Sequence, residues 1–195
     1  MMITLPIFPL STHILPGGRL PLTIFEPRYL SMITQCCRNK EPFGIVCIQP
    51  QISHAESQLM PIGTGVTIVD FDLLQGGILG VIVEGQFRFR MRNPQLSTET
   101  TCHHADQATV QKLSTWPVIT LPESEHYIAD CLSQIYIQYP ELGKLYQNPQ
   151  LKNLTWLCQR WLEVLPLSIH EKQAIMAAPN CERIHQLLIE MLKGS

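Results

Sequence analysis

This sequence lacks the features that place a protein in a membrane or export it from the cell. No stretch of its 195 residues approaches the roughly 18 uninterrupted apolar residues of a transmembrane helix. The N-terminus has neither the basic segment nor the unbroken apolar segment of a signal peptide. We therefore expect a cytoplasmic protein with no membrane partner.

An excess of either charge is also missing. The 14 basic and 16 acidic residues leave a net charge of −2. This balance provides no overall field for holding nucleic acid, so any nucleic-acid contact would need a local patch. The content of 45% hydrophobic and 15% charged residues suits one domain, or two small packed lobes, with a real core.

The common signatures of nucleotide-binding and hydrolytic enzymes are absent as well. No G-x-x-x-x-G-K-[ST] motif supplies the phosphate cradle of an ATPase. No G-x-S-x-G motif presents a nucleophile, although a Ser-Lys pair distant in sequence stays open. Gly63-Thr64-Gly65 is half of a dinucleotide fingerprint without the third glycine, and we interpret it as a turn. We expect neither an enzyme nor a cofactor.

The sequence has seven cysteines but no C-x-x-C pair, which argues against a zinc ribbon or a thioredoxin-like site. Most of them lie in apolar patterns that are typical of buried free thiols in a reducing compartment. Cys102-His103-His104 with Asp106 is the one cluster of metal-ligand types. A closed site there would have to recruit His126 or His54. We favour a polar loop with Cys102 as the most exposed thiol, and no metal.

Prolines dominate the N-terminal region. Each proline in the run from Leu5 to Phe25 lacks an amide donor, which excludes a long helix and a regular central strand. We therefore expect short edge strands there, whose apolar residues must be buried against a larger element. Pro27 suits the first position of a helix that ends before Asn39.

Further strands follow this helix. Apolar patterns bounded by turn residues predict strands over residues 43–48, 63–74, 78–92 and 108–113. Gln75-Gly76-Gly77 supplies the turn of a hairpin between the two longest of them. Gly85 in mid-strand indicates a bulge or a bend. These short strands predict a small curled sheet or barrel in residues 1–118.

One strand carries a row of arginines. Apolar and basic residues alternate along this strand: Phe87, Phe89 and Met91 lie between Arg88, Arg90 and Arg92. We therefore expect the apolar side chains to face inward and the guanidinium groups outward. This row can pair with acidic peptide groups or RNA phosphates. Its separation from the aromatic rings disfavours base stacking. A solvated face, neutralised by acidic residues of the paired strand, is the simpler interpretation.

The chain becomes helical after Trp116-Pro117. Apolar spacings of three and four residues predict helices around residues 128–139, 154–165 and 184–191. Ser168 followed by Glu171 is a capping-box pattern that opens a further helix. We therefore expect a helical bundle over residues 119–195.

A set of short segments, in chain order, resembles a known family. These segments are Leu5 to Leu10, Pro16-Gly17-Gly18, Leu20-Pro21-Leu22, Phe25-Glu26-Pro27-Arg28-Tyr29, Pro42-Phe43-Gly44, Gly63-Thr64-Gly65, Val83-Glu84-Gly85 with Phe87-Arg88, and Leu165-Pro166-Leu167-Ser168 with Glu171-Lys172. They resemble the N-terminal, substrate-binding domain of Lon proteases, and most closely the small bacterial proteins that consist of that domain alone. The resemblance spans nearly the whole chain.

This resemblance implies an α+β fold, with a PUA-like β pseudo-barrel lobe and one helix over residues 1–118 and a helical lobe over 119–195. It implies a non-catalytic module that recognises unfolded or tagged polypeptides, as an accessory to protein quality control or proteolysis. An ATP-dependent protease is the candidate protein partner. The oligomeric state of this chain stays open.

Such a module would bind weakly and promiscuously through apolar contacts in a groove between the lobes, with added strand pairing along a sheet edge. It should also expose a contiguous apolar patch. The candidate residues for peptide binding are Phe25, Glu26, Arg28 and Tyr29 at the helix start, together with Arg88, Arg90 and Arg92. The alternative is an RNA-binding pseudo-barrel that uses the arginine row, with an affinity that falls steeply with salt.

Overall fold

The computed structural model describes residues 1–49, 58–73, 78–92 and 105–193 of the chain. The chain forms two compact units, Met1–Leu113 and Ser114–Ser195. The first unit carries the strands and the second carries only helices, apart from an isolated bridge between Thr120 and Asn153. The α+β fold is therefore as predicted, and the domain boundary at residue 118 stays a prediction.

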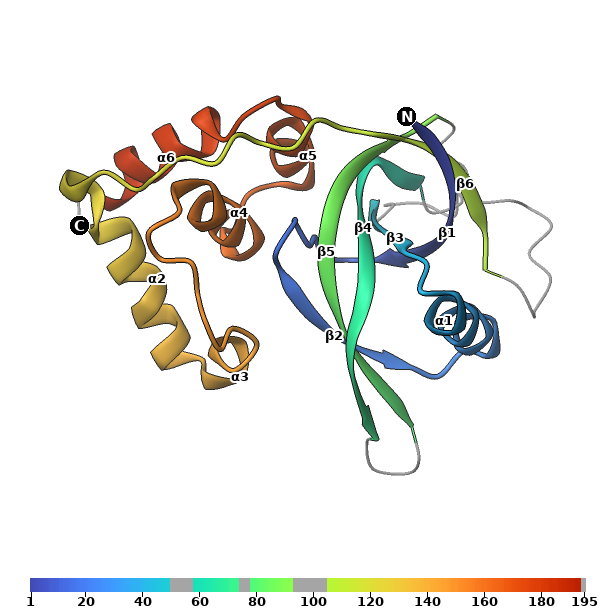
Figure 1. Cartoon of the computed structure of the whole chain (residues 1–195). Coiled ribbons are helices and arrows are strands. Elements are labelled where there is room, and N and C mark those ends of the chain that lie inside the picture. The colour runs from blue at the N-terminus through green and yellow to red at the C-terminus, as the bar shows by residue number, and fades with distance from the viewer. Residues whose placement is uncertain (50–57, 74–77, 93–104, 194–195) are drawn as a thin grey trace. The chain divides into compact units, whose positions relative to one another are not determined.

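The first unit is organised around a six-stranded sheet in the order β2-β5-β4-β3-β1-β6. Its strands are β1 (Met2–Leu10), β2 (Arg19–Ile24), β3 (Phe43–Gln49), β4 (Gln58–Leu73), β5 (Leu79–Met91) and β6 (Gln107–Lys112). Because β6 pairs with both β1 and β5, the strands β5, β4, β3, β1 and β6 close a ring. β2 lies outside this ring, on the first half of β5 (Figure 1).

The expectation of edge strands is wrong for β1 and right for β2. The first half of β1, Met2–Pro6, pairs antiparallel with β6, and the second half, Ile7–Leu10, pairs parallel with β3. β1 therefore lies inside the sheet order, but each half has a partner strand on one side only within the described residues. Pro6 and Pro9 fit because a strand with one unused side tolerates a missing amide donor.

β2 joins β5 through a close approach of the backbone at Gly85. The Gly85 N–H donates to the Gly18 carbonyl at 2.9 Å, and the Gly85 carbonyl accepts from the Gly17 N–H at 2.8 Å. A Cβ atom at position 85 would overlap the carbonyl oxygen of Leu15. Gly17 has a φ of 73°, which also favours glycine. The bulge predicted at Gly85 is present, because the β4–β5 register shifts there.

The segment Gly63-Thr64-Gly65 is not the turn that we expected, because it lies in the middle of β4. A Cβ atom at Gly63 would lie 2.6 Å from the ring of Phe89, and one at Gly65 would overlap the ring of Phe87. The two glycines therefore leave room for aromatic rings of the neighbouring strand.

Two hydrophobic clusters stabilise this unit. One cluster takes buried residues from all the ring strands, namely Leu5, Ile7, Val46, Leu59, Phe89, Met91 and Val110. The other packs α1 (Pro27–Asn39) against the sheet through Tyr29, Met32, Ile33 and Cys36. Pro27 opens α1 as predicted, and Lys40 ends it in the left-handed conformation with a φ of 56°.

The second unit contains the short helix η2 (Glu123–Glu125) and the helices α2 (Tyr127–Gln138), α3 (Pro140–Gly143), α4 (Leu154–Val164), α5 (Ile169–Ala177) and α6 (Glu182–Leu192). The helices α2, α4, α5 and α6 begin and end close to the predicted positions, whereas η2 and α3 were not predicted. The predicted capping box of α5 is formed, since Ser168 and Glu171 exchange both hydrogen bonds. In the part of the chain that is described, no helix is both long and apolar enough to cross a membrane.

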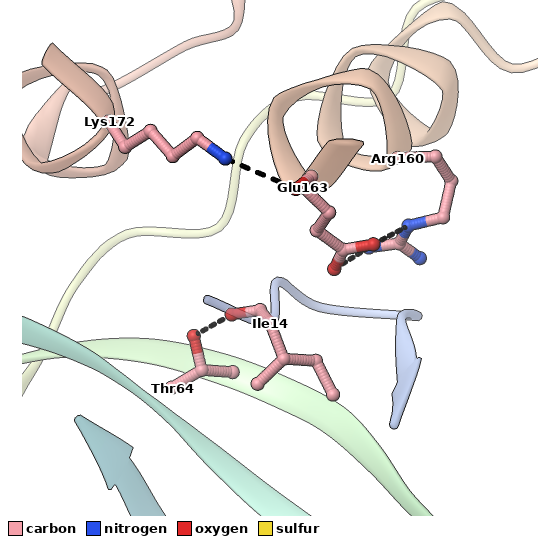
Figure 2. Close-up of polar contacts among 5 residues, drawn as sticks. All are labelled: Ile14, Thr64, Arg160, Glu163 and Lys172. Atoms are coloured by element: carbon pink, nitrogen blue, oxygen red, sulfur yellow. Dashed lines mark hydrogen bonds and ion pairs between the residues drawn. The ribbon is translucent and has the colours of Figure 1, made fainter. Parts of the chain in front are cut away.

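Helix α4 carries a buried ion pair. The Arg160 side chain is 1% exposed, and its Nε and Nη2 donate to the carboxylate of Glu163 at 2.8 and 3.0 Å (Figure 2). The Lys172 Nζ donates to the Glu163 backbone carbonyl at 3.1 Å, which connects α5 to the end of α4 (Figure 2). This pairing offsets part of the cost of burying the guanidinium group.

Some sequence-based expectations concern residues outside the described ranges. These are the hairpin turn Gln75-Gly76-Gly77, the exposure of Cys102, and the histidines His54, His103 and His104. Among the residues that are described, no group of three His, Cys, Asp or Glu side chains is arranged to hold a metal ion.

The close approach at Gly85 predicts that Gly85→Ala destabilises the first unit by about 1–3 kcal/mol, because the added methyl group must displace the backbone at Leu15. Urea denaturation should show this as a lower midpoint. The matched variant Gln86→Ala alters the neighbouring exposed position and should stay within about 0.5 kcal/mol of the wild type. Equal stabilities of the two variants would contradict the packing described here.

The orientation of α1 predicts different reactivities for its two adjacent cysteines. Cys36 is buried and Cys37 is exposed. Burial, more than the neighbouring Glu41 and Cys37, raises the pKa of Cys36 to about 11, so at pH 8 only about one part in a thousand is the reactive thiolate. Iodoacetamide in native buffer should modify Cys37 and leave Cys36 intact, as peptide mass spectrometry can measure. Modification of both in denaturant is the control.

Candidate functional site

A pocket of about 480 Å³ opens in the first unit where the ends of β1, β2 and β3 meet the start of α1. Its lining residues are Phe8, Pro9, Leu10, Pro21, Leu22, Thr23, Ile24, Phe25, Glu26, Arg28, Tyr29 and Ile48. The peptide-binding candidates at the helix start are all among them. The pocket therefore brings together the residues Phe25, Glu26, Arg28 and Tyr29.

The local sequence explains why these side chains reach the pocket. β2 ends at Ile24 and α1 begins at Pro27, so that Phe25 and Glu26 form the whole link between strand and helix (Figure 1). The Glu26 carbonyl accepts hydrogen bonds from the N–H groups of Tyr29 and Leu30, both at 3.0 Å. These bonds close the first helical turn beside the pocket.

The floor of the pocket is aromatic and aliphatic. The rings of Phe8 and Tyr29 lie 4.4 Å apart, centroid to centroid, and Phe43 extends the cluster 6.3 Å from Phe8. Phe8 and Tyr29 are 7% and 8% exposed, and Leu22 and Ile24 are also buried. Because these residues belong to the hydrophobic cluster beneath α1, the floor is held by the packing of the domain and is preformed.

The rim of the pocket carries one pair of opposite charges. The Arg28 Nε donates to the Glu26 Oε2 at 2.8 Å, and the guanidinium carbon lies 4.6 Å from the centre of the Tyr29 ring. Both charged side chains are partly exposed, so that the pair contributes little to stability. Burial raises the pKa of Tyr29, and the nearby Arg28 partly opposes this shift. The opposite charges of Glu26 and Arg28 leave the rim with almost no net charge.

Phe25 is a largely exposed aromatic residue of the pocket lining. Along β2 the side chains of Leu22 and Ile24 are buried, whereas Pro21 and Thr23 are exposed. Phe25 continues this alternation on the exposed side, and 72% of it is accessible to solvent. A bound partner that covered this ring would gain hydrophobic free energy that folding has left unused.

The arginine row does not form as expected. Arg90 and Arg92 are exposed, but Arg88 is only 2% exposed. The expectation that all three guanidinium groups face solvent is therefore wrong for Arg88. The inward placement of Phe89 is correct, since it is fully buried.

Arg88 is buried because the outer face of the sheet is covered at this point. Arg88 lies opposite Thr64 in the β4–β5 ladder, so both side chains are on the same face. The Thr64 hydroxyl donates to the Ile14 carbonyl at 2.5 Å, which places the β1–β2 connection over this face (Figure 2). Burial lowers the pKa of Arg88 to about 10. Alternation along a strand cannot reveal such a covering segment.

None of the arginines at positions 88, 90 and 92 lines the pocket described above. The candidate site therefore consists of the helix-start residues and an apolar floor. Sequence reasoning identified Phe8 and Leu22 as residues that need burial, but not as parts of a site. The available signal was their position next to Pro6, Pro9 and Pro21, in the proline-rich run that precedes the predicted helix start. The pocket lies wholly within the first unit. It is therefore not the expected groove between the two lobes, which stays a prediction.

Comparison with protein families gives a match over nearly the whole chain. The family described as the ATP-dependent protease La (LON) substrate-binding domain matches residues 4–194. None of the curated proteins compared with the chain matches it.

Solved structures show the same fold. The crystal structure of a Lon N-terminal domain protein from Xanthomonas campestris is 24% identical, with a TM-score of 0.72, and the match covers 97% of this chain and 99% of that one. The N-terminal domain of the Mycobacterium avium complex Lon protease is 12% identical, with a TM-score of 0.61 and 98% of both chains covered. At these identities the two structures support the fold alone.

The division of the pocket into a packed floor and an exposed aromatic group predicts very unequal effects of two substitutions on stability. Tyr29→Ala should destabilise the protein by about 3–5 kcal/mol, because it removes a buried ring from the Phe8 cluster. Phe25→Ser, at a largely exposed position, should change stability by no more than about 0.5 kcal/mol. Thermal unfolding followed by circular dichroism measures both. A large loss of stability in Phe25→Ser would show that its ring belongs to the core.

Proposed function

The chain belongs to the family of Lon substrate-binding domains, and from this premise we propose that it is a non-catalytic module that binds unfolded polypeptides in the pocket beside Phe25. The observation that carries the proposal is an exposed phenylalanine next to a preformed aromatic floor. The family supports substrate binding in general, and the geometry of the pocket supports its location.

The size and lining of the pocket fit side chains of a polypeptide. Its volume of about 480 Å³ lies within the range of about 300–1,000 Å³ that is usual for ligand sites. The buried floor of Phe8, Leu22, Ile24 and Tyr29 can cover a large apolar side chain without selecting one shape. Unfolded polypeptides expose such side chains, whereas folded proteins keep them inside.

Electrostatics favour an uncharged segment at this site. The charged groups of the rim, Glu26 and Arg28, already pair with each other at 2.8 Å. A ligand with a charge at this point would have to separate them or remain without a partner. The pocket has no cluster of cations for phosphate groups, and Arg88 is buried elsewhere on the sheet. These features favour polypeptide over RNA.

Such a module would serve proteolysis by holding substrates. An apolar site with few polar contacts gives weak and promiscuous binding, which suits recognition of many unfolded chains. We propose an ATP-dependent protease as the partner that receives them. This role needs no catalytic group in the chain itself, and the pocket side chains include no nucleophile paired with a base.

The proposal predicts that Phe25→Ser weakens the binding of an unfolded polypeptide. β-Casein labelled with a fluorophore is a suitable probe, and fluorescence anisotropy measures its affinity. Since covering an exposed phenylalanine contributes about 1–2 kcal/mol, the loss should be about five- to thirtyfold. Phe71→Ser is the matched control, because Phe71 is also an exposed phenylalanine, at 52%, but does not line the pocket.

Three results would argue against the proposed site. Wild-type protein that does not bind β-casein would contradict the function itself. An equal loss of affinity in Phe25→Ser and Phe71→Ser would place binding outside the pocket. Retention of nucleic acid from extract that is lost with rising salt would instead support RNA as the ligand.

A further inference from the structure

The pocket is bordered by an edge of β2 that no other described strand uses. β2 pairs with β5 from Arg19 to Ile24, and within the described residues it pairs with no second strand. Pro21, Thr23 and the neighbouring residues of β2 also line the pocket. The unused edge and the apolar floor therefore border the same space.

Hydrogen bonds at one end of the ladder show which way the backbone groups of β5 point. The Gly85 N–H donates to Gly18 and the Gly85 carbonyl accepts from Gly17, so both groups of Gly85 face the chain that leads into β2. In an antiparallel strand these groups alternate in direction from one residue to the next. The backbone N–H and carbonyl of Val83 therefore also point toward β2, and so do those of Val81.

The same alternation applies to β2. Leu20 lies opposite Val83 and Leu22 lies opposite Val81, so Leu20 and Leu22 exchange the hydrogen bonds of the ladder. The residues between and after them, Pro21 and Thr23, point their backbone groups away from β5. Thr23 thus offers an N–H and a carbonyl on the free edge, and Pro21 offers a carbonyl.

We propose that an extended segment of unfolded polypeptide binds as an added strand along this edge of β2. Its backbone pairs with Thr23 and the Pro21 carbonyl, and its alternate side chains lie over the floor of Phe8 and Tyr29. This inference rests on the proposed function and specifies how the same site holds its ligand. Strand addition uses groups that every polypeptide has, which explains how one site accepts many sequences.

The chemistry of the edge favours a foreign segment over a second copy of this chain. If two β2 strands paired antiparallel with Pro21 at the centre, Pro21 of one copy would lie opposite Pro21 of the other, and both would lack a donor. If they paired with Leu22 at the centre, each Pro21 would lie opposite Thr23 of the other copy, and every such pair would lose one of its two hydrogen bonds. An incoming segment without proline keeps all its donors. The paired charges of Glu26 and Arg28 leave the rim near neutral, so the segment is apolar and uncharged where it crosses the rim.

Backbone methylation of a bound peptide tests this mode directly. Short overlapping peptides of β-casein are first ranked by anisotropy, and the tightest is then synthesised with a single N-methyl group at each successive residue. Added-strand binding predicts losses of about five- to tenfold at alternate positions, where the N–H faces Thr23 or Pro21. The intervening positions carry the same methyl group facing away and serve as matched controls.

Substitutions at Thr23 provide the complementary measurement on the protein. Thr23→Pro removes the donor on the free edge and should weaken the peptide by a similar factor, because an edge strand tolerates proline. Phe71→Ser, on a strand outside the pocket, should bind like the wild type. Thermal unfolding shows whether Thr23→Pro is folded, and if it is not, the methylation scan decides.

The possible outcomes separate this inference from the proposed function. Losses at alternate positions support the added strand. Binding that no single methyl group weakens would overturn the inference and leave a pocket that holds side chains only. No binding of any peptide would contradict the proposed function. A dimer in sedimentation that dissociates in Thr23→Pro would overturn the inference in favour of a second copy on this edge.

Discussion

The backbone bonds between Gly85 and the Gly17–Gly18 turn are the contact on which the site depends. They hold β2 against β5 outside the closed ring of strands, at a distance that only glycine at position 85 permits. The position of β2 then determines where Phe25 lies and where α1 starts. A small side chain at one position of the sheet would therefore disturb a pocket that it does not line.

Proline shapes the same region in different ways. In β1, Pro6 and Pro9 fall where each half of the strand needs only one partner. In β2, Pro21 has no N–H to donate on the free edge, which limits pairing between two copies of the chain. The backbone N–H of Thr23 remains as a donor on that edge. Pro27 starts the helix whose first turn borders the pocket. One residue type thus separates strand from helix and restricts what can pair with the edge.

Much of the fold was predictable because its signals are local. The start of α1 at Pro27, the paired long strands and the capping box at Ser168 follow from turn residues, alternation and capping rules. The errors arose where a distant segment decided the outcome. Arg88 obeys the strand alternation but is covered near Ile14, and the glycines around Thr64 accommodate rings from another strand instead of forming a turn.

The sequence by itself determined the family, the fold class and the helix-start residues of the site, because these depend on residue type and order along the chain. Only the tertiary structure decided that Phe8 and Tyr29 form one floor, that Arg88 is excluded from the surface, and that one edge of β2 stays unpaired among the described strands. The physical reason is that burial and pairing depend on what lies across from a residue. Closure of the strand ring brings together segments that are far apart in the sequence, and no local sequence pattern indicates which of them meet.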